Sequence, residues 1–220
     1  MLLSRRALLV ALVLTTLTLA STACGFAAPT AIVSDEGMAA LVAKPVALPD
    51  MALGSDTAPI TIVEYSSLTC PHCTAFAQNV FPMLQSRYID TGKVRFVSRD
   101  FPLDFKAAAA SMLARCAANG DASKFFEATM MLFKQQQDLV EHTTDTLAAI
   151  GAKFGMTVSE VEKCVKSDDI LDKLQAAQTF AHNQLKVGAT PTSFFINGAK
   201  VEGSMSFEEL EAKLLPLLKH

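Results

Sequence analysis

The stretch PITIVEYSSLTCPHC, residues 59–73, changes its pattern part-way and thereby decides the fold. Its first half, Pro59–Tyr65, is rich in β-branched residues and almost continuously apolar, which predicts a strand buried on both faces. Apolar side chains then recur at helical spacing as far as Tyr88, and Pro82 is expected to kink this helix. A second strand is predicted at residues 94–99. The order strand, helix, strand predicts two parallel strands joined by a right-handed crossover.

The rest of the chain divides into a helical block and a short return to strands. Residues 106–185 show helical spacing throughout, in five predicted helices. Residues 192–201 predict a hairpin around the tight turn Asn197-Gly198, and a last helix follows. This order predicts an α/β fold in which residues 51–105 and 186–220 share one sheet, and in which residues 106–185 are an inserted all-helical subdomain.

The first 27 residues have the pattern of a secretory signal peptide. Ser4-Arg5-Arg6 precedes the apolar run Ala7–Ala20, which small residues follow. A membrane-spanning helix is the alternative, but it needs about 18–20 apolar residues. Cleavage after Ala27 competes with lipid attachment at Cys24, and the two arginines also resemble a twin-arginine signal. We therefore expect an exported protein in which residues 28–50 form an N-terminal tether.

Composition narrows the classes of function. The formal net charge is −3, so there is no basic excess to bind nucleic acid. Half of the residues are hydrophobic, which excludes a wholly disordered chain. Besides Cys24, four cysteines remain, and an even number in an oxidising compartment suggests two pairs. They are Cys70, Cys73, Cys116 and Cys164.

The sequence Cys70-Pro71-His72-Cys73 lies where a buried strand passes into a helix. As the N-cap residue, Cys70 would face unpaired backbone N–H groups and the positive end of the helix dipole, both of which favour its thiolate. Pro71 suits the first helical position, and His72 can add a positive charge. Cys73 follows about one turn later and is predicted to point inward, which leaves Cys70 as the exposed, attacked sulfur. A stabilised thiolate favours the reduced dithiol, so the disulfide form is expected to oxidise client thiols.

A zinc or copper site and an inert structural disulfide are the alternatives for this motif. An ordinary zinc site needs a second pair of ligands. The other cysteines are far apart in sequence, and His142, His182 and His220 show no paired spacing. We therefore predict no metal site.

With Gly188–Gly198 and the helical block, this motif resembles the DsbA-type thiol–disulfide oxidoreductases of the thioredoxin superfamily over residues 50–219. The resemblance implies a thioredoxin fold (βαβ…ββα) that carries the helical subdomain. It also implies a periplasmic enzyme, without a bound cofactor, that gives its disulfide to reduced or unfolded secreted proteins. A membrane DsbB-type quinone reductase is the implied partner that reoxidises it, and we expect a monomer.

Two further positions gain a role from the resemblance. Thr190-Pro191 resembles the cis-proline loop that faces the cysteines, although well-known relatives carry Val before this proline. The presence of Thr190 where those relatives have Val bears on the oxidising strength. The alternative to a cis-proline loop is an ordinary trans proline at the start of an edge strand. Glu64, inside an otherwise apolar strand, matches a buried acid that moves the proton of Cys73. The alternative is a carboxylate that faces solvent or pairs with Arg95 or Arg99.

Cys116 and Cys164 fall in different predicted helices of the insertion. We hypothesise a second, structural disulfide between them, with two separate buried thiols as the alternative.

The sequence thus predicts an exported oxidoreductase that introduces disulfides. A disulfide isomerase or reductase is the nearest alternative, but residues 28–50 are short for the dimerisation module that such shuffling enzymes use. A non-enzymatic metal-binding or client-holding module is the other.

Overall fold

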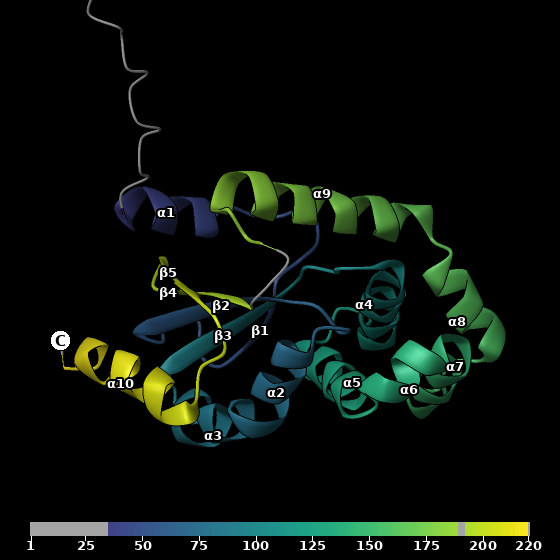
Figure 1. The fold of residues 1–220 in the computed structure, drawn as a ribbon, viewed down its shortest axis with the longest axis horizontal. Helices are drawn as coiled ribbons and strands as arrows, with labels where there is room; N and C mark the ends of the chain where they lie inside the picture. The colour runs from purple at the N-terminus through teal and green to yellow at the C-terminus, as the bar shows by residue number, and fades with distance from the viewer. Residues whose placement is uncertain (1–34, 189–191, 220) are drawn as a thin grey trace, which may run out of the picture. The chain divides into compact units, whose positions relative to one another are not determined.

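The computed structural model describes residues 35–188 and 192–219. They form one five-stranded sheet and the helices that cover it (Figure 1). The strand order is β1-β3-β2-β4-β5, in which β2 and β3 are parallel and every other neighbouring pair is antiparallel. The strands are β1 (Met51–Leu53), β2 (Ile60–Ser66), β3 (Val94–Asp100), β4 (Ser193–Ile196) and β5 (Ala199–Glu202). The mixed sheet and the helical insertion confirm the predicted fold class.

Strand β2 is buried on both faces, as its continuous apolar pattern predicts. Ile60 and Ile62 belong to one core, and Val63 and Tyr65 belong to a second core on the opposite face. Figure 1 shows the helices that cover these faces. On the first face lie α2 (Pro71–Asn79), α3 (Phe81–Leu84), a π-helical turn (Gln85–Ile89), α5 (Ala122–Lys134) and α10 (Phe207–Leu217), and on the second lie α1 (Asp35–Val42) and α9 (Asp168–Leu185).

The hairpin between β4 and β5 follows its predicted turn chemistry. Asn197 and Gly198 have φ angles of 47° and 89°, which a two-residue hairpin turn of type I′ requires. The Asn197 side chain accepts the backbone N–H of Thr61 at 2.7 Å and so ties the turn to β2. A Cβ atom at Gly198 would overlap Ala39 of α1, so the turn and α1 approach each other closely.

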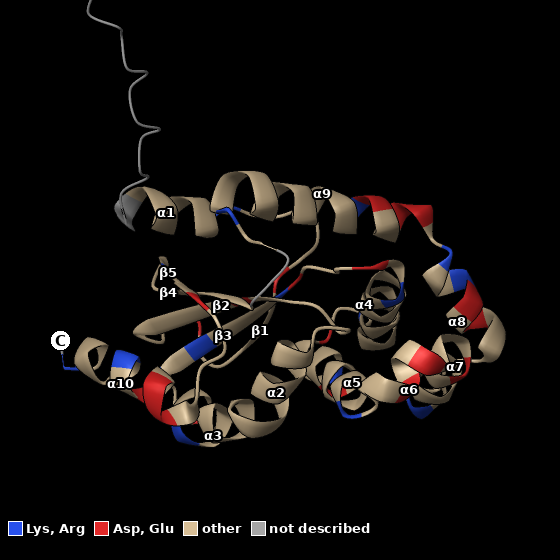
Figure 2. Cartoon of the chain, in the orientation of Figure 1, with Lys and Arg blue, Asp and Glu red and all other residues tan. Residues whose placement is uncertain are grey.

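The inserted helical subdomain, residues 106–185, is called the lobe here and contains one helix that the sequence pattern did not predict. Its helices are α4 (Phe105–Ala118), α5, α6 (Gln136–Glu141), α7 (Thr143–Lys153), α8 (Val158–Val165) and α9. The missed helix is α6, which is short and has a single buried residue, Leu139. The last helix leaves the lobe and contacts β3, so the insertion also covers the second face of the sheet. Figure 2 shows acidic residues at the N-terminal end of α9, where the helix dipole favours them.

The segment predicted as a tether, residues 28–50, contains α1 in its described part. This helix packs against α9 and β5 instead of extending away from the domain. Met38 and Leu41 are its partly buried contacts with the second core, which Val42 joins. The predicted signal segment, residues 1–27, lies outside the described residues.

Candidate active site

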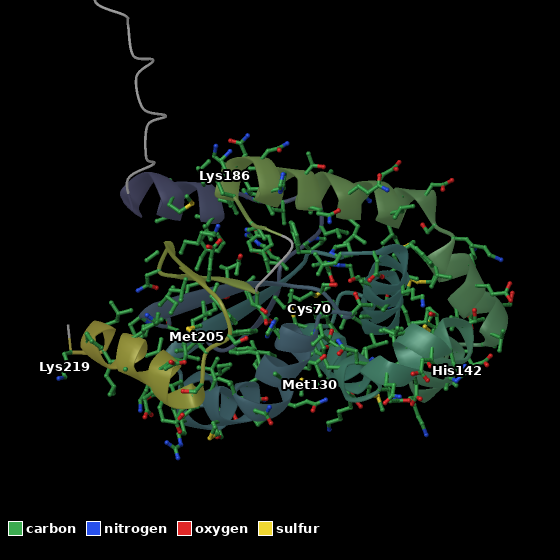
Figure 3. The ribbon with its side chains drawn as sticks, viewed as in Figure 1. Cys70, Met130, His142, Lys186, Met205 and Lys219 are labelled. Carbon is green, nitrogen blue, oxygen red and sulfur yellow. A yellow bond between two sulfur atoms is a disulfide. The ribbon has the colours of Figure 1, made fainter. Side chains whose placement is uncertain are left out.

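The active-site turn joins the end of β2 to the start of α2. Cys70 is the N-cap residue of α2, with an extended backbone (φ −83°, ψ 121°), and Pro71 occupies the first turn of the helix. The Cys70 N–H donates to the carbonyl oxygen of Ser67 at 3.1 Å, which closes the turn. Cys70 therefore lies at the N-terminus of α2 (Figure 3), where the first N–H groups of a helix have no partner within it.

The surroundings of Cys70 favour its thiolate. They lower the pKa of Cys70 to about 6, first through a hydrogen bond from the Cys73 thiol. Burial opposes this effect, whereas the backbone N–H groups of Cys73 and His72 and the charge of His72 add to it. Both cysteines are free thiols here. A sulfur with these neighbours can act as a thiolate at neutral pH.

Cys70 is less exposed than the sequence predicted. Its residue surface is 3 % exposed, against 2 % for Cys73, so exposure does not distinguish the two cysteines. The reason is that the start of α2 is surrounded by β2, by the connection from β3 to α4 and by the approach to β4. The hollow at the dithiol is lined by Tyr65, Ser66, Ser67, Phe101, Leu103, Gly188 and Thr192.

Cys73 points into the packing between α2 and the sheet, as predicted. Its sulfur lies 3.5 Å from the backbone nitrogen of Ser67 and 3.2 Å from the hydroxyl oxygen of Thr192. The pKa of Cys73 is raised, first because its thiol donates to Cys70, then by burial and by the charge of Glu64. Cys73 therefore holds its proton while Cys70 loses one.

Glu64 is buried beneath the dithiol on the first face of the sheet. It is 6 % exposed and lines a small pocket with Phe76 and Phe96. Burial, and then the charge of Cys70, raise the pKa of Glu64 to about 8. A neutral carboxyl that ionises near pH 8 can exchange a proton with a neighbouring thiol.

The two arginines considered as partners of Glu64 have other partners. Arg95 pairs with Asp56 at 2.9 Å. Arg99 pairs with Asp50 at 2.7 Å and donates to the Tyr65 hydroxyl at 2.8 Å, on the opposite face of the sheet. Glu64 thus faces neither solvent nor an arginine.

The remaining predicted site residues are placed as follows. His72 is exposed, and its Nδ1 lies 2.8 Å from the hydroxyl oxygen of Ser204. Pro71 is also exposed. Thr190 and Pro191 lie outside the described residues, but the residues that flank this segment, Gly188 and Thr192, both line the hollow at the cysteines.

Three residues that no sequence pattern marked contact the active-site turn. They are Ser67 and Thr192, at the sulfur of Cys73, and Gln136 of α6. The Gln136 side-chain amide donates to the carbonyl oxygens of Leu68 and Cys70. The one available signal was the position of Thr192 directly after Pro191, since that loop was expected to face the cysteines.

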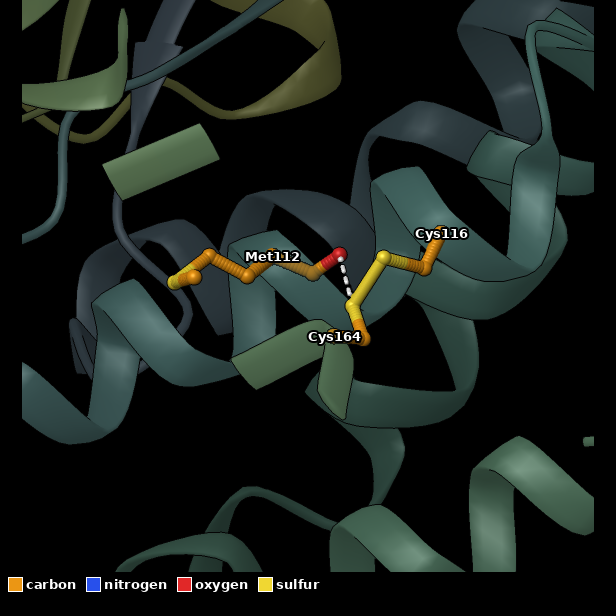
Figure 4. The surroundings of a disulfide bond; sticks show 3 residues. All are labelled: Met112, Cys116 and Cys164. Atoms are coloured by element: carbon orange, nitrogen blue, oxygen red, sulfur yellow. Dashed lines mark hydrogen bonds between the residues drawn. A yellow bond between two sulfur atoms is a disulfide. The ribbon is translucent and has the colours of Figure 1, made fainter. Parts of the chain in front are cut away.

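Cys116 and Cys164 form a disulfide that joins α4 to α8 (Figure 4). Their Cα atoms are 6.3 Å apart, and 48 positions separate them in the sequence. The bond lies beside a small core of the lobe that contains Met112 and Leu174. It is thus separate from the dithiol at α2.

Within residues 35–188 and 192–219, no cluster of three or more His, Cys, Asp or Glu side chains has the arrangement of a metal site. None of the helices described combines the length and the apolar character of a membrane-crossing span.

The fold and the site define a thioredoxin-fold protein with a dithiol at the start of a helix. The thioredoxin family model matches residues 47–214. A probable disulfide bond formation protein D of Bacillus cereus is 31 % identical over 156 residues, which are 67 % of this chain and 69 % of that protein. The crystal structure of Wolbachia pipientis alpha-DsbA1 superposes with a TM-score of 0.69 at 29 % identity, covering 84 % of this chain and 96 % of the other. The chain belongs to the thioredoxin family, in its DsbA-type branch.

A longer relative is the putative protein-disulfide oxidoreductase of Rickettsia bellii. It is 38 % identical over 155 residues, which are 70 % of this chain but 59 % of the relative. The chain thus spans less than two thirds of the length of the Rickettsia proteins that it matches.

Proposed function

We propose that the chain is an exported thiol:disulfide oxidoreductase that introduces disulfides into other proteins through Cys70 and Cys73. The observation that carries the proposal is the asymmetry of the dithiol. Cys70, at the helix N-terminus, has a pKa lowered to about 6, while the pKa of Cys73 is raised. The names of the similar proteins, which refer to disulfide oxidoreduction and disulfide bond formation, support the same chemistry.

The proposed reaction is two thiol–disulfide exchanges. A client thiolate attacks the Cys70 sulfur of the Cys70–Cys73 disulfide, the bond between the two cysteines breaks, and its electron pair goes to Cys73. A second client thiolate then attacks the client sulfur of the mixed disulfide and releases Cys70 as a thiolate. The client is oxidised by two electrons, the protein is reduced, and Glu64 is the proposed proton donor to Cys73.

The direction of this reaction follows from the stability of the reduced form. A thiolate that its surroundings stabilise makes the dithiol more stable relative to the disulfide, which raises the reduction potential. We therefore propose oxidation of clients as the main activity. His72 and Pro71 support the Cys70 thiolate, and the Thr190-Pro191 segment is proposed to present the client chain to Cys70.

Export is proposed from the sequence pattern of residues 1–27. Reduced secreted proteins are the proposed clients, and a membrane DsbB-type quinone reductase is the proposed reoxidant. We propose that the protein acts as a monomer and that residues 106–185 form its inserted subdomain. Lipid attachment at Cys24 remains the competing form of processing.

Equilibration with glutathione buffers tests the direction. The reduction potential should lie closer to that of DsbA, about −120 mV, than to that of thioredoxin, about −270 mV. A value near −270 mV would support a reductase, and rapid reshuffling of a scrambled client would support an isomerase. The Cys70→Ser variant should lose all dithiol oxidation, and full activity in that variant would mean that Cys70 is not the catalytic cysteine. No oxidation by the unmodified chain would instead indicate a non-enzymatic module.

A further inference from the structure

Two hydrogen-bond donors, the Ser67 backbone N–H and the Thr192 hydroxyl, lie within 3.5 Å of the sulfur of Cys73. In the proposed reaction this sulfur leaves as a thiolate when a client attacks Cys70. We propose that the Thr192 hydroxyl and the Ser67 backbone N–H stabilise this thiolate, and that Thr192 is therefore a catalytic residue of the exchange. The inference rests on the proposed function, because it assigns Thr192 to the first step of that reaction.

The chain topology explains why the two donors meet at one sulfur. Strands β2 and β4 are antiparallel neighbours, and Tyr65 of β2 pairs with Ser193 of β4. Ser67 follows the end of β2, and Thr192 precedes the start of β4, so both lie at the same end of these two antiparallel strands. The helix α2 begins at that end of the sheet and places Cys73 between them.

The direction of the hydrogen bonds at Cys73 follows from proton counting. In the reduced protein the single S–H proton of Cys73 is donated to Cys70. The Ser67 nitrogen can only donate, at 3.5 Å. The Thr192 hydroxyl lies 3.2 Å away. Once Cys73 has left as a thiolate it carries no proton, so the hydroxyl can only donate to it.

Because the Cys73 sulfur is buried, its thiolate depends on these two donors for stabilisation. Ser67, Cys73 and Thr192 are 3 %, 2 % and 5 % exposed, so water is largely excluded from the sulfur. A thiolate formed in such a place needs donors from the protein, since an unpaired buried charge is strongly unfavourable. Both donors favour ionisation of Cys73 and act against burial and the nearby Glu64 charge.

Both donors are held in place by other contacts. The Ser67 hydroxyl accepts the backbone N–H of Leu103 at 3.2 Å, which fixes the turn after β2. The carbonyl oxygen of Thr192 accepts the N–H of Gly203 at 3.2 Å, which fixes the approach to β4. The donors are therefore preorganised before the thiolate forms.

A client thiolate bonds to the Cys70 sulfur, the Cys70–Cys73 bond breaks, and the electron pair resides on Cys73 while Ser67 and Thr192 donate to it. The proton that Cys73 then takes comes from the Glu64 carboxyl or from solvent.

The experiment compares three variants of the full chain in their oxidised form. Thr192→Val keeps the shape of the side chain and removes the donor, whereas Thr192→Ser keeps a hydroxyl. Ser193→Ala is the matched control, because the Ser193 hydroxyl is buried one residue further along and has no hydrogen-bond partner. The measurement is the rate of mixed-disulfide formation with a reduced cysteine peptide, by stopped flow and acid quench.

Loss of one hydrogen bond to a charged sulfur should slow this step by roughly ten- to a hundred-fold in Thr192→Val. Thr192→Ser and Ser193→Ala should stay within about two-fold of the unmodified chain. In a Cys70→Ser background, Thr192→Val should also move the alkylation profile of Cys73 to higher pH, a shift that a merely structural role would not produce.

Two results would overturn the assignment of Thr192. One is a Thr192→Val rate equal to that of Ser193→Ala, and the other is a Thr192→Ser rate as slow as that of Thr192→Val. If the valine variant does not fold, Thr192→Ala carries the same prediction. If the unmodified chain does not exchange with the peptide at all, the proposed function fails instead, so the two failures are distinguishable.

Discussion

The side-chain amide of Gln136 lies 3.1 Å from the carbonyl oxygen of Cys70, to which it donates a hydrogen bond. The same nitrogen donates to the carbonyl oxygen of Leu68 at 2.9 Å. Gln136 is the first residue of α6, so the inserted lobe holds the active-site turn directly. On the other side of the turn, the Thr69 hydroxyl donates to Asp104, the N-cap of α4, at 2.7 Å. The lobe thus supports the geometry of the dithiol from two helix N-termini.

Replacing Gln136 by alanine should loosen this support. Gln136→Ala removes the donor of the Leu68 carbonyl oxygen and leaves the Cys70 carbonyl oxygen with the Thr74 N–H at 3.1 Å. The free energy of unfolding should therefore fall by about 1–2 kcal/mol. Urea unfolding of the reduced protein measures the change. Gln137→Ala is the control, because Gln137 is exposed and its amide donates to Glu141 on the same helix. Equal unfolding midpoints for the two variants would show that the amide contributes nothing.

The ionisation of Cys70 should be visible in the ultraviolet. Thiolate absorbance near 240 nm should rise with a midpoint near pH 6 in the reduced protein, because the pKa of Cys70 is lowered to about 6. This step should be absent in Cys70→Ser. A midpoint above about pH 8 would mean that the helix N-terminus and Cys73 do not stabilise the thiolate.

The same shift makes the stability of the reduced protein depend on pH. In the unfolded chain Cys70 has a pKa of about 8.5, which is higher than in the folded chain. The folded thiolate therefore contributes stability that is complete above about pH 8.5 and is lost as the pH falls through 6. The difference in unfolding free energy between reduced wild type and Cys70→Ala should grow from pH 5 to pH 9.

Glu64 should act in the opposite sense. The pKa of Glu64 is raised to about 8, so its neutral form is favoured in the folded state. Its contribution to stability is complete below the unfolded pKa of about 4.3 and is lost as the pH rises through 8. Glu64→Gln, which stays neutral, should therefore be more stable than wild type at pH 9, by up to about 5 kcal/mol.

The measurement for Glu64 is urea unfolding of the oxidised proteins at pH 5 and pH 9. Neither cysteine of the active site titrates in that form, so the charge of Cys70 is absent and burial, the largest cause, alone raises the pKa of Glu64. The gain should be small at pH 5 and large at pH 9. Glu127→Gln is the control, because Glu127 is exposed on α5. A gain of the same size in both variants, or no gain at pH 9, would indicate that Glu64 is not held neutral by burial.

Four of the five described strands, β2 to β5, could be predicted from the sequence because their signals are local. Strand β1 was not predicted, because it is only three residues long and is held by its pairing with β3. Strand β2 is marked by its own β-branched residues, and the β4–β5 turn by the dipeptide Asn197-Gly198. Helices α1 and α6 could not be predicted in this way. Both are short, and α1 is stabilised by packing on α9 and β5, far away in sequence.

The residues of the candidate site also fall into two groups, those that local sequence patterns predict and those that only long-range contacts bring to the site. Cys70, Cys73 and Glu64 lie within ten positions of one another, on a strand and helix that the pattern predicts. Thr192 contacts Cys73 across 119 positions, and Gln136 contacts Cys70 across 66. The register of β4 against β2 and the docking of the lobe decide these contacts. The low exposure of Cys70 has the same origin, because segments from three parts of the chain surround it.

The disulfide between Cys116 and Cys164 should stabilise the lobe without taking part in catalysis. It closes a loop across 48 positions and restricts the unfolded chain, so its removal should cost about 2–4 kcal/mol of unfolding free energy. The double variant Cys116→Ser, Cys164→Ser should show this loss in urea unfolding and keep the rate of peptide oxidation within about two-fold. Peptide mapping under non-reducing conditions provides the direct check, and two freely alkylated cysteines would contradict the bond. A large loss of activity in a folded double variant would instead mean that the lobe transmits its disulfide state to the active-site turn through α6 and Gln136.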